Sequence, residues 1–135
     1  MFFLDELKNS ILDEDFYKTN EILEKVYNEE NAFDYISELL ELMEENPELD
    51  YGMPGPVVHF MEKFYKNGYE KLLLASVKKY PTTQTVWMIN RIINDNTLGD
   101  RTQYIQVLME VSNRNDVPEE VRNEAKEFYN YQTRR

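Results

Sequence analysis

Residues 33–45 read Phe-Asp-Tyr-Ile-Ser-Glu-Leu-Leu-Glu-Leu-Met-Glu-Glu, and this stretch decides the class of fold. Its apolar side chains recur every three or four residues, at Phe33, Ile36, Leu39, Leu40 and Met43. This spacing predicts an α-helix with one apolar side, because a half-buried strand would alternate apolar and polar residues. The pattern stops at Asn46-Pro47, since proline disfavours helical backbone in the residue before it.

The same periodicity continues in both directions and predicts about eight helices joined by short turns, with no strand. We therefore expect one all-helical domain over residues 1–135. Short helices need neighbours to cover their apolar sides. Two architectures meet that need: a short α-solenoid of stacked helix pairs, HEAT- or armadillo-like, and a compact helical bundle.

The boundaries between helices carry recognisable signals. Residues 50–56, Asp-Tyr-Gly-Met-Pro-Gly-Pro, predict a loop whose last proline opens the next helix. That helix is expected to end near Gly68, in left-handed conformation. Further start signals are a cap at Thr82 or Thr83 and capping boxes at Asp100 with Gln103 and at Asp116 with Glu119.

Composition argues against most enzyme classes. The chain has no cysteine and one histidine, and it lacks a glycine-rich phosphate loop and a zinc-binding His-Glu-x-x-His pair. We therefore expect no enzyme, no cofactor and no metal. His59 is interpreted as a half-buried ring bonded to a backbone carbonyl; the alternative is an acid or base acting with Glu62, three residues along the same helix. Without a signal peptide or a long apolar run, the expected location is the cytoplasm, with no membrane contact.

Charge is distributed unevenly along the chain. The net charge is −11, and residues 1–50 hold 16 of the 26 acidic residues against only three lysines. Residues 51–135 hold the other 10 acidic residues and 12 basic ones. Such a chain repels nucleic acid and attracts basic proteins.

The acidic residues of one predicted helix share a side. Asp34, Glu38, Glu41 and Glu45 follow one another at spacings of four, three and four residues, with no Lys or Arg between Lys25 and Lys63. This is either a solvated helix surface or a docking surface for a basic partner. We favour docking and predict these contact residues: Asp34, Glu38, Glu41, Glu45 and Asp50, with Tyr51 as an anchor at the rim.

The middle of the chain resembles a known family. The resemblance lies in residues 50–65 and in Gly68-Tyr69-Glu70, Leu72-Leu73, Pro81-Thr82 and residues 85–91, Thr-Val-Trp-Met-Ile-Asn-Arg. These stretches resemble helical-repeat immunity proteins of bacterial contact-dependent growth inhibition and polymorphic-toxin systems. The resemblance implies a HEAT- or armadillo-like stack that binds and blocks a cognate toxin domain, often a basic RNase or DNase.

Within the resembling segment we expect structural roles. Gly52 and Gly55 would let the chain turn, Pro54 and Pro56 would set its direction, and Trp87 would pack. Asn90 and Arg91 would hold carbonyls of the preceding turn, and His59 would lie near Trp87. The expected function is toxin neutralisation by the acidic surface. The alternative is an adaptor that binds a peptide or helix in its groove.

Overall fold

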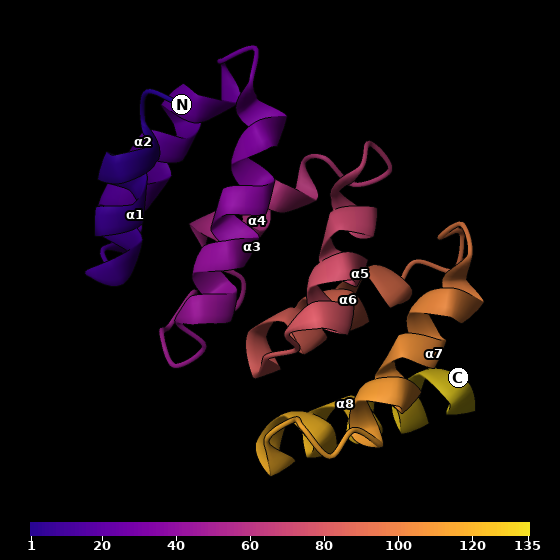
Figure 1. The fold of residues 1–135 in the computed structure, drawn as a ribbon. Coiled ribbons are helices and arrows are strands. Elements are labelled where there is room, and N and C mark those ends of the chain that lie inside the picture. Colours follow the sequence, from indigo (N-terminus) through magenta and orange to yellow (C-terminus); the bar gives the residue numbers. More distant parts are fainter. The chain divides into compact units, whose positions relative to one another are not determined.

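The computed structural model describes all residues from Met1 to Arg135 and contains eight α-helices, one 3-10 helix and no strand (Figure 1). The all-α prediction is confirmed. The elements in chain order are α1 Leu4–Leu12, α2 Phe16–Tyr27, η1 Ala32–Asp34, α3 Tyr35–Glu45, α4 Pro56–Glu62, α5 Tyr69–Lys79, α6 Thr83–Ile93, α7 Arg101–Ser112 and α8 Glu119–Arg134. None of these helices is both long and apolar enough to cross a membrane.

The chain forms two compact units, residues Met1–Leu72 and Leu73–Arg135, and the boundary between them falls inside α5. We call them the N-terminal unit and the C-terminal unit. A solenoid and a bundle are both consistent with this set of helices. The organisation as a single domain remains a prediction.

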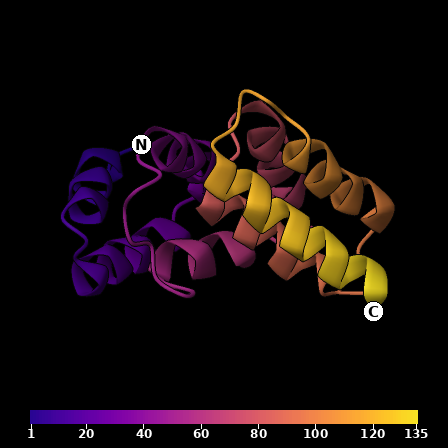
Figure 2. The same cartoon turned by 90° about the horizontal axis from the view of Figure 1, so that it is seen from below.

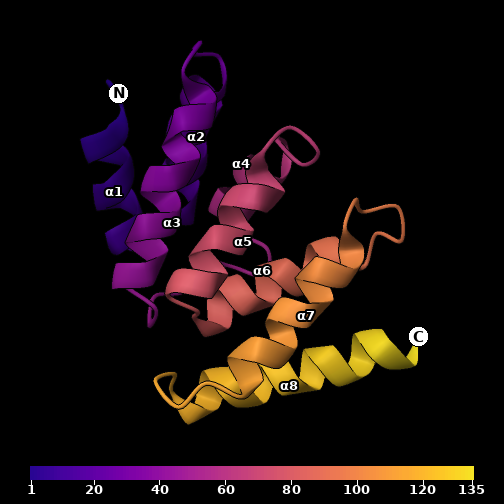
Figure 3. The same cartoon turned by 45° about the vertical axis from the view of Figure 1, so that its right-hand side comes forward.

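The N-terminal unit buries one side of each of its helices. Helix α1 packs against α2 and α3, and α2 also packs against α4; Figure 3 shows α1, α2 and α3 as neighbours. The fully buried side chains include Leu7, Val26, Ile36, Met43 and Val58. Each comes from a position that the helical period assigns to the apolar side of its helix.

The loop before α4 has the predicted chemistry. Pro56 is the first residue of α4, and Gly52 has a φ of +92°, which a side chain would strain. A Cβ at Gly55 would overlap the carbonyl oxygen of Tyr51. The turn therefore requires both glycines.

Helix α4 is shorter than predicted, because it ends at Glu62. Beyond it the backbone tightens into i to i+3 hydrogen bonds: the amide nitrogens of Lys63, Phe64 and Tyr65 each bond the carbonyl oxygen three residues earlier. Gly68 has the expected left-handed conformation, with a φ of +110°. Gly68 therefore ends the series of turns that follows α4, whereas α4 itself ends at Glu62.

In the C-terminal unit, α8 lies across α6 and α7 (Figure 2). The buried side chain of Gln132 on α8 joins these helices. Its amide nitrogen donates to the side-chain oxygens of Asn90 and Asn94, both at 2.8 Å. Its oxygen accepts hydrogen bonds from Arg101 at 3.0 Å and Arg135 at 2.8 Å. A buried amide with all of these bonds satisfied fixes the position of α8.

One of the three predicted capping signals is confirmed. The hydroxyl oxygen of Thr82 accepts a hydrogen bond from the amide of Thr85, and the hydroxyl oxygen of Thr85 accepts one from the amide of Thr82, both at 3.1 Å. Asp100 makes no side-chain cap because its φ of +56° turns the backbone left-handed. The box at Asp116 is also wrong: α8 begins at Glu119, after Pro118.

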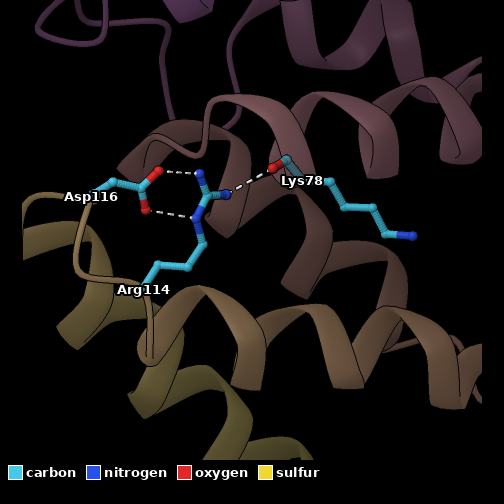
Figure 4. Close-up of polar contacts among 3 residues, drawn as sticks. All are labelled: Lys78, Arg114 and Asp116. Carbon is cyan, nitrogen blue, oxygen red and sulfur yellow. Dashed lines mark hydrogen bonds and ion pairs between the residues drawn. The ribbon is translucent and has the colours of Figure 1, made fainter.

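The carboxylate of Asp116 has a different partner, shown in Figure 4. The guanidinium of Arg114 donates two hydrogen bonds to it, at 2.9 and 2.8 Å, and a third to the carbonyl oxygen of Lys78 at 2.7 Å. The Arg114 hydrogen bond lowers the pKa of Asp116, and Asp116 in turn raises the pKa of Arg114. Arg114 thus ties the end of α5 to the loop before α8.

The substitution Gly68→Ala should lower the free energy of unfolding by roughly 1–3 kcal/mol. An alanine there must adopt a φ of +110°, and its Cβ would lie 2.8 Å from Cζ of Phe33. The matched control is Gly99→Ala, where a Cβ meets nothing within 4 Å. Urea unfolding of both variants checks this; equal stabilities would contradict the assigned packing of Phe33.

The Asp116 carboxyl should titrate below the ordinary range for aspartate. A group whose pKa is lowered by folding stabilises the fold above its unfolded pKa and loses that contribution as the pH falls through its folded pKa. NMR titration of the side-chain carbon in the wild type and in Arg114→Gln measures the effect. We expect the pKa of Asp116 to return towards its ordinary value in the variant, whereas an unchanged pKa would exclude Arg114 as its cause.

Candidate functional site

The predicted acidic side of α3 exists and faces solvent. Asp34, at the end of η1, and Glu41 and Glu45 on α3 are exposed. None of the three carboxylates forms an ion pair or a side-chain hydrogen bond. We call these three residues the acidic face.

The orientation of the acidic face follows from what α3 buries. The buried side chains of the helix are Tyr35, Ile36, Leu39, Leu40, Leu42 and Met43. At 100° per residue they occupy one half of the helix circumference, and the acidic face lies within the other half. Because the apolar side of α3 packs against the core, the three carboxylates lie on the same, solvent-facing side.

Glu38 differs from its predicted role. It lies on the same side of α3, but its carboxylate pairs with Nζ of Lys8 on α1 at 3.4 Å. Both side chains are about one-third exposed, so the pair contributes little stability. The prediction that this side of α3 has no compensating cation is wrong at Glu38, because a lysine 30 residues earlier is brought beside it.

Asp50 belongs to the loop beyond α3 and does not extend its acidic side. One of its carboxylate oxygens accepts a hydrogen bond from the amide of Gly52 at 2.9 Å. Its own amide donates to the carboxylate of Glu14 at 2.6 Å. Asp50 therefore helps to hold the loop against the turn between α1 and α2.

Tyr51 is not a rim anchor, and that prediction is wrong. Its side chain is 3% exposed, and its hydroxyl donates to the carbonyl oxygen of Asn46 at 2.7 Å. Burial, followed by the charges of Glu48 and Glu14, raises the pKa of the phenol well above its usual value. Tyr51 connects the end of α3 to the loop from inside, where no partner can reach it.

The two units carry very different charge. The N-terminal unit has 18 carboxylates and six cations, a net charge of −12, whereas the C-terminal unit has a net charge of +1. Several arginines of the C-terminal unit bond within it: Arg114 to Asp116, and Arg101 to Gln132 and the carbonyl oxygen of Ile93. The net negative charge of the chain thus originates in the N-terminal unit.

In the resembling segment, the structural roles expected of Gly52, Gly55 and Pro56 are observed. Gly52, Gly55 and Pro56 build the turn before α4, with Pro54 between them. His59 is exposed, so its interpretation as a half-buried ring is wrong. The reason is its position on α4, opposite the buried Val57, Val58, Phe60 and Met61.

The later residues of that segment lie on α6. Trp87 is partly exposed, and the guanidinium carbon of Arg91 lies 5.2 Å from the centre of its ring, a cation–π contact. The side-chain oxygen of Asn90 accepts from Gln132 on α8. Asn90 therefore joins two helices, a role different from the predicted bond to the preceding turn.

Sequence reasoning missed a group of exposed apolar side chains near the Asp50 loop. Leu12, Phe16 and Tyr17 are 44%, 40% and 78% exposed, and Met53 is 84% exposed. A cavity of about 10 Å³ lies among Ile11, Phe16, Thr19, Asp50, Tyr51, Pro56 and Val57. Phe16 follows the helical spacing of the buried Thr19 and Leu23, so its pattern did not distinguish it from a buried residue.

Two features of the chain bear on the binding of metal ions and small ligands. No group of three or more His, Cys, Asp or Glu side chains is arranged to hold a metal ion. An open depression of about 500 Å³ lies on α8, along Glu127, Asn130, Tyr131, Arg134 and Arg135. The guanidinium of Arg135 already bonds Gln132, the carbonyl of Asn94 and the side chain of Asn96.

The substitution Tyr51→Phe should lower the free energy of unfolding by about 0.5–1.5 kcal/mol, the usual net value of one hydrogen bond. The carbonyl oxygen of Asn46 loses its donor while the ring stays buried. Thermal or urea unfolding measures the change. Tyr17→Phe, at an exposed tyrosine, is the matched control and should leave stability unchanged.

Comparison of the chain with protein-family models, with curated proteins and with solved structures finds no match. The feature of the chain that bears on function is the acidic face, which is exposed to solvent on a unit with a net charge of −12.

Proposed function

We propose that this chain is a non-catalytic binding protein that docks a basic partner protein on the acidic face. More specifically, we propose that it is an immunity protein acting in the cytoplasm, where it neutralises a toxin domain of the RNase or DNase type. The observation that carries the proposal is that Asp34, Glu41 and Glu45 are exposed on one side of a helix without any cation of their own.

Electrostatic repulsion among the carboxylates of the acidic face favours the binding of a basic surface there. Like charges one helical turn apart destabilise a helix by about 0.2–0.5 kcal/mol per pair. A basic surface placed against Glu41 and Glu45 replaces that repulsion by attraction. The net charge of −12 on the N-terminal unit also accelerates the approach of a cationic partner.

A nuclease fits this description of a partner. Enzymes that cleave RNA or DNA line their clefts with Lys and Arg that bind phosphates. A row of carboxylates can occupy such a cleft in place of phosphates and exclude the substrate. The same negative charge makes direct binding of nucleic acid by this chain unfavourable.

The runner-up is an adaptor that binds a peptide or helix of another protein. The exposed Tyr17 and Met53 favour it, because a peptide-binding surface needs apolar contacts. An enzymatic role would require His59 and Glu62, and neither residue lines the depression on α8 or the small cavity near Asp50.

The test is the triple charge reversal Asp34→Lys, Glu41→Lys and Glu45→Lys. The reading frame beside this gene is first sequenced, and the absence of a toxin domain there would contradict the immunity role. In cells that produce such a neighbouring toxin domain, the wild type should restore growth and the variant should not. With purified proteins, the association rate should fall by about tenfold or more at low salt, and its dependence on salt should flatten.

The matched control reverses three exposed glutamates of the C-terminal unit, Glu110, Glu120 and Glu127. It changes the net charge equally but leaves the acidic face intact, so it should still protect. Circular dichroism of both variants checks that they remain folded. If the acidic-face variant protects as well as the wild type, the proposed docking face is wrong.

A further inference from the structure

Most of the exposed large apolar side chains of the N-terminal unit lie in two short segments, and the others are Met1, Phe2 and Tyr27. Of the nine large apolar side chains that are exposed in the whole chain, four lie in two short segments, 12–17 and 50–55: Leu12, Phe16, Tyr17 and Met53. Scattered apolar side chains on a surface are ordinary, whereas a group of them is typical of a binding site.

One hydrogen bond joins these segments, and a second one stabilises the loop that contains Asp50. The amide of Asp50 donates to Glu14 at 2.6 Å across 36 residues of sequence, and the amide of Gly52 donates to Asp50 at 2.9 Å. Phe16 and Asp50 also line the same small cavity. In Figure 1 the turn between α1 and α2 and the loop after α3 lie at the same end of the N-terminal unit. We call the four apolar residues and the acidic residues around them the turn patch.

The acidic residues of the turn patch set its charge. The patch contains Asp13, Glu14, Asp15, Glu48 and Asp50, and no lysine or arginine occurs in residues 9–17 or 46–55. Asp13 and Glu48 make no ion pair or side-chain hydrogen bond, and Asp15 caps α2 by accepting from the amide of Lys18 at 3.0 Å. The patch thus combines exposed apolar side chains with a rim of negative charge.

This combination selects one kind of occupant. A second copy of the chain would bring the same carboxylates to the patch, and an anionic membrane or nucleic acid would also be repelled. A basic segment that carries large apolar side chains is complementary in both respects. The cavity beside Phe16 holds about 10 Å³, room for one water molecule, so such side chains would lie on the surface and not enter a pocket.

We infer that the turn patch docks a basic amphipathic segment of the partner protein, whose apolar side chains cover Phe16, Tyr17 and Met53 while its lysines or arginines face the surrounding carboxylates. The inference rests on the proposed function in one respect, namely that the partner is a cationic protein. It adds a second contact, on other elements than α3, that supplies apolar burial. Apolar contact slows dissociation, whereas charge mainly accelerates association.

The test uses two synthetic peptides and the full chain. The first peptide has leucines at helical spacing and lysines at the other positions; the second has serines in place of the leucines and the same charge. The variant Tyr17→Ser with Met53→Ser removes two side chains that are 78% and 84% exposed, so the fold should tolerate it. The matched control is Tyr80→Ser with Tyr131→Ser, at exposed tyrosines of the C-terminal unit.

We expect the wild type to bind the leucine peptide about tenfold or more tightly than the serine peptide, as measured by calorimetry. The turn-patch variant should lose that preference, and the tyrosine control should keep it. NMR shifts on addition of the leucine peptide should centre on Phe16, Tyr17 and Met53. Retention of the preference in the turn-patch variant would overturn the inference, as would a wild type that binds both peptides equally or neither.

The charge-reversal variant of the acidic face separates this inference from the proposed function. It should weaken both peptides by a similar factor, because it removes attraction without changing the apolar contact. If it fails to restore growth while the turn-patch variant still binds the leucine peptide like the wild type, the acidic face stands and the turn patch is wrong. If the acidic-face variant restores growth, the proposed function fails whatever the peptides show.

Discussion

Burial of the apolar side of α3 is the constraint on which the rest of the N-terminal unit depends. Six side chains between Tyr35 and Met43 are buried. Their burial contributes far more free energy to folding than any single interaction on the surface. Once that side faces the core, helix geometry alone directs Glu41 and Glu45 to the opposite side. The acidic face is thus a geometric consequence of packing, and no polar interaction is needed to hold it in place.

Polar and charged side chains have different surroundings in the two units. In the C-terminal unit, Arg114 and Arg101 bond to neighbouring helices and loops, and Gln132 receives and donates bonds in a buried network. These interactions fix elements relative to one another within that unit. In the N-terminal unit most carboxylates remain in solvent, where they oppose one another. A surface that retains such repulsion is one on which a cationic partner gains free energy by binding.

Under the proposed function, the acidic face and the turn patch contribute differently to binding. Charge on α3 acts over about a Debye length, roughly 8–10 Å, and governs encounter. The turn patch acts only at contact, through Phe16, Tyr17 and Met53, and would govern how long the complex lasts. The hydrogen bond from Asp50 to Glu14 holds its two segments together before any partner arrives, which limits the entropy lost on binding.

Local signals in the sequence were sufficient for the helices. Apolar spacing predicted the helical segments and the inward side of α3, Pro56 predicted the start of α4, and Thr82 predicted the cap of α6. Each of these depends on residues within one or two turns of one another, so a single stretch of chain contains all the information. The orientation of Asp34, Glu41 and Glu45 belongs to this class.

Other features depended on partners far away in sequence, and only the tertiary structure decided them. Lys8 on α1 neutralises Glu38 on α3, and the carboxylate of Glu14 accepts a hydrogen bond from the amide of Asp50. The packing of the unit also buries Tyr51. Periodicity specifies which side of a helix is apolar but not which neighbour covers it or whether any does. The exposure of Phe16 and the burial of Tyr51 therefore had to come from packing.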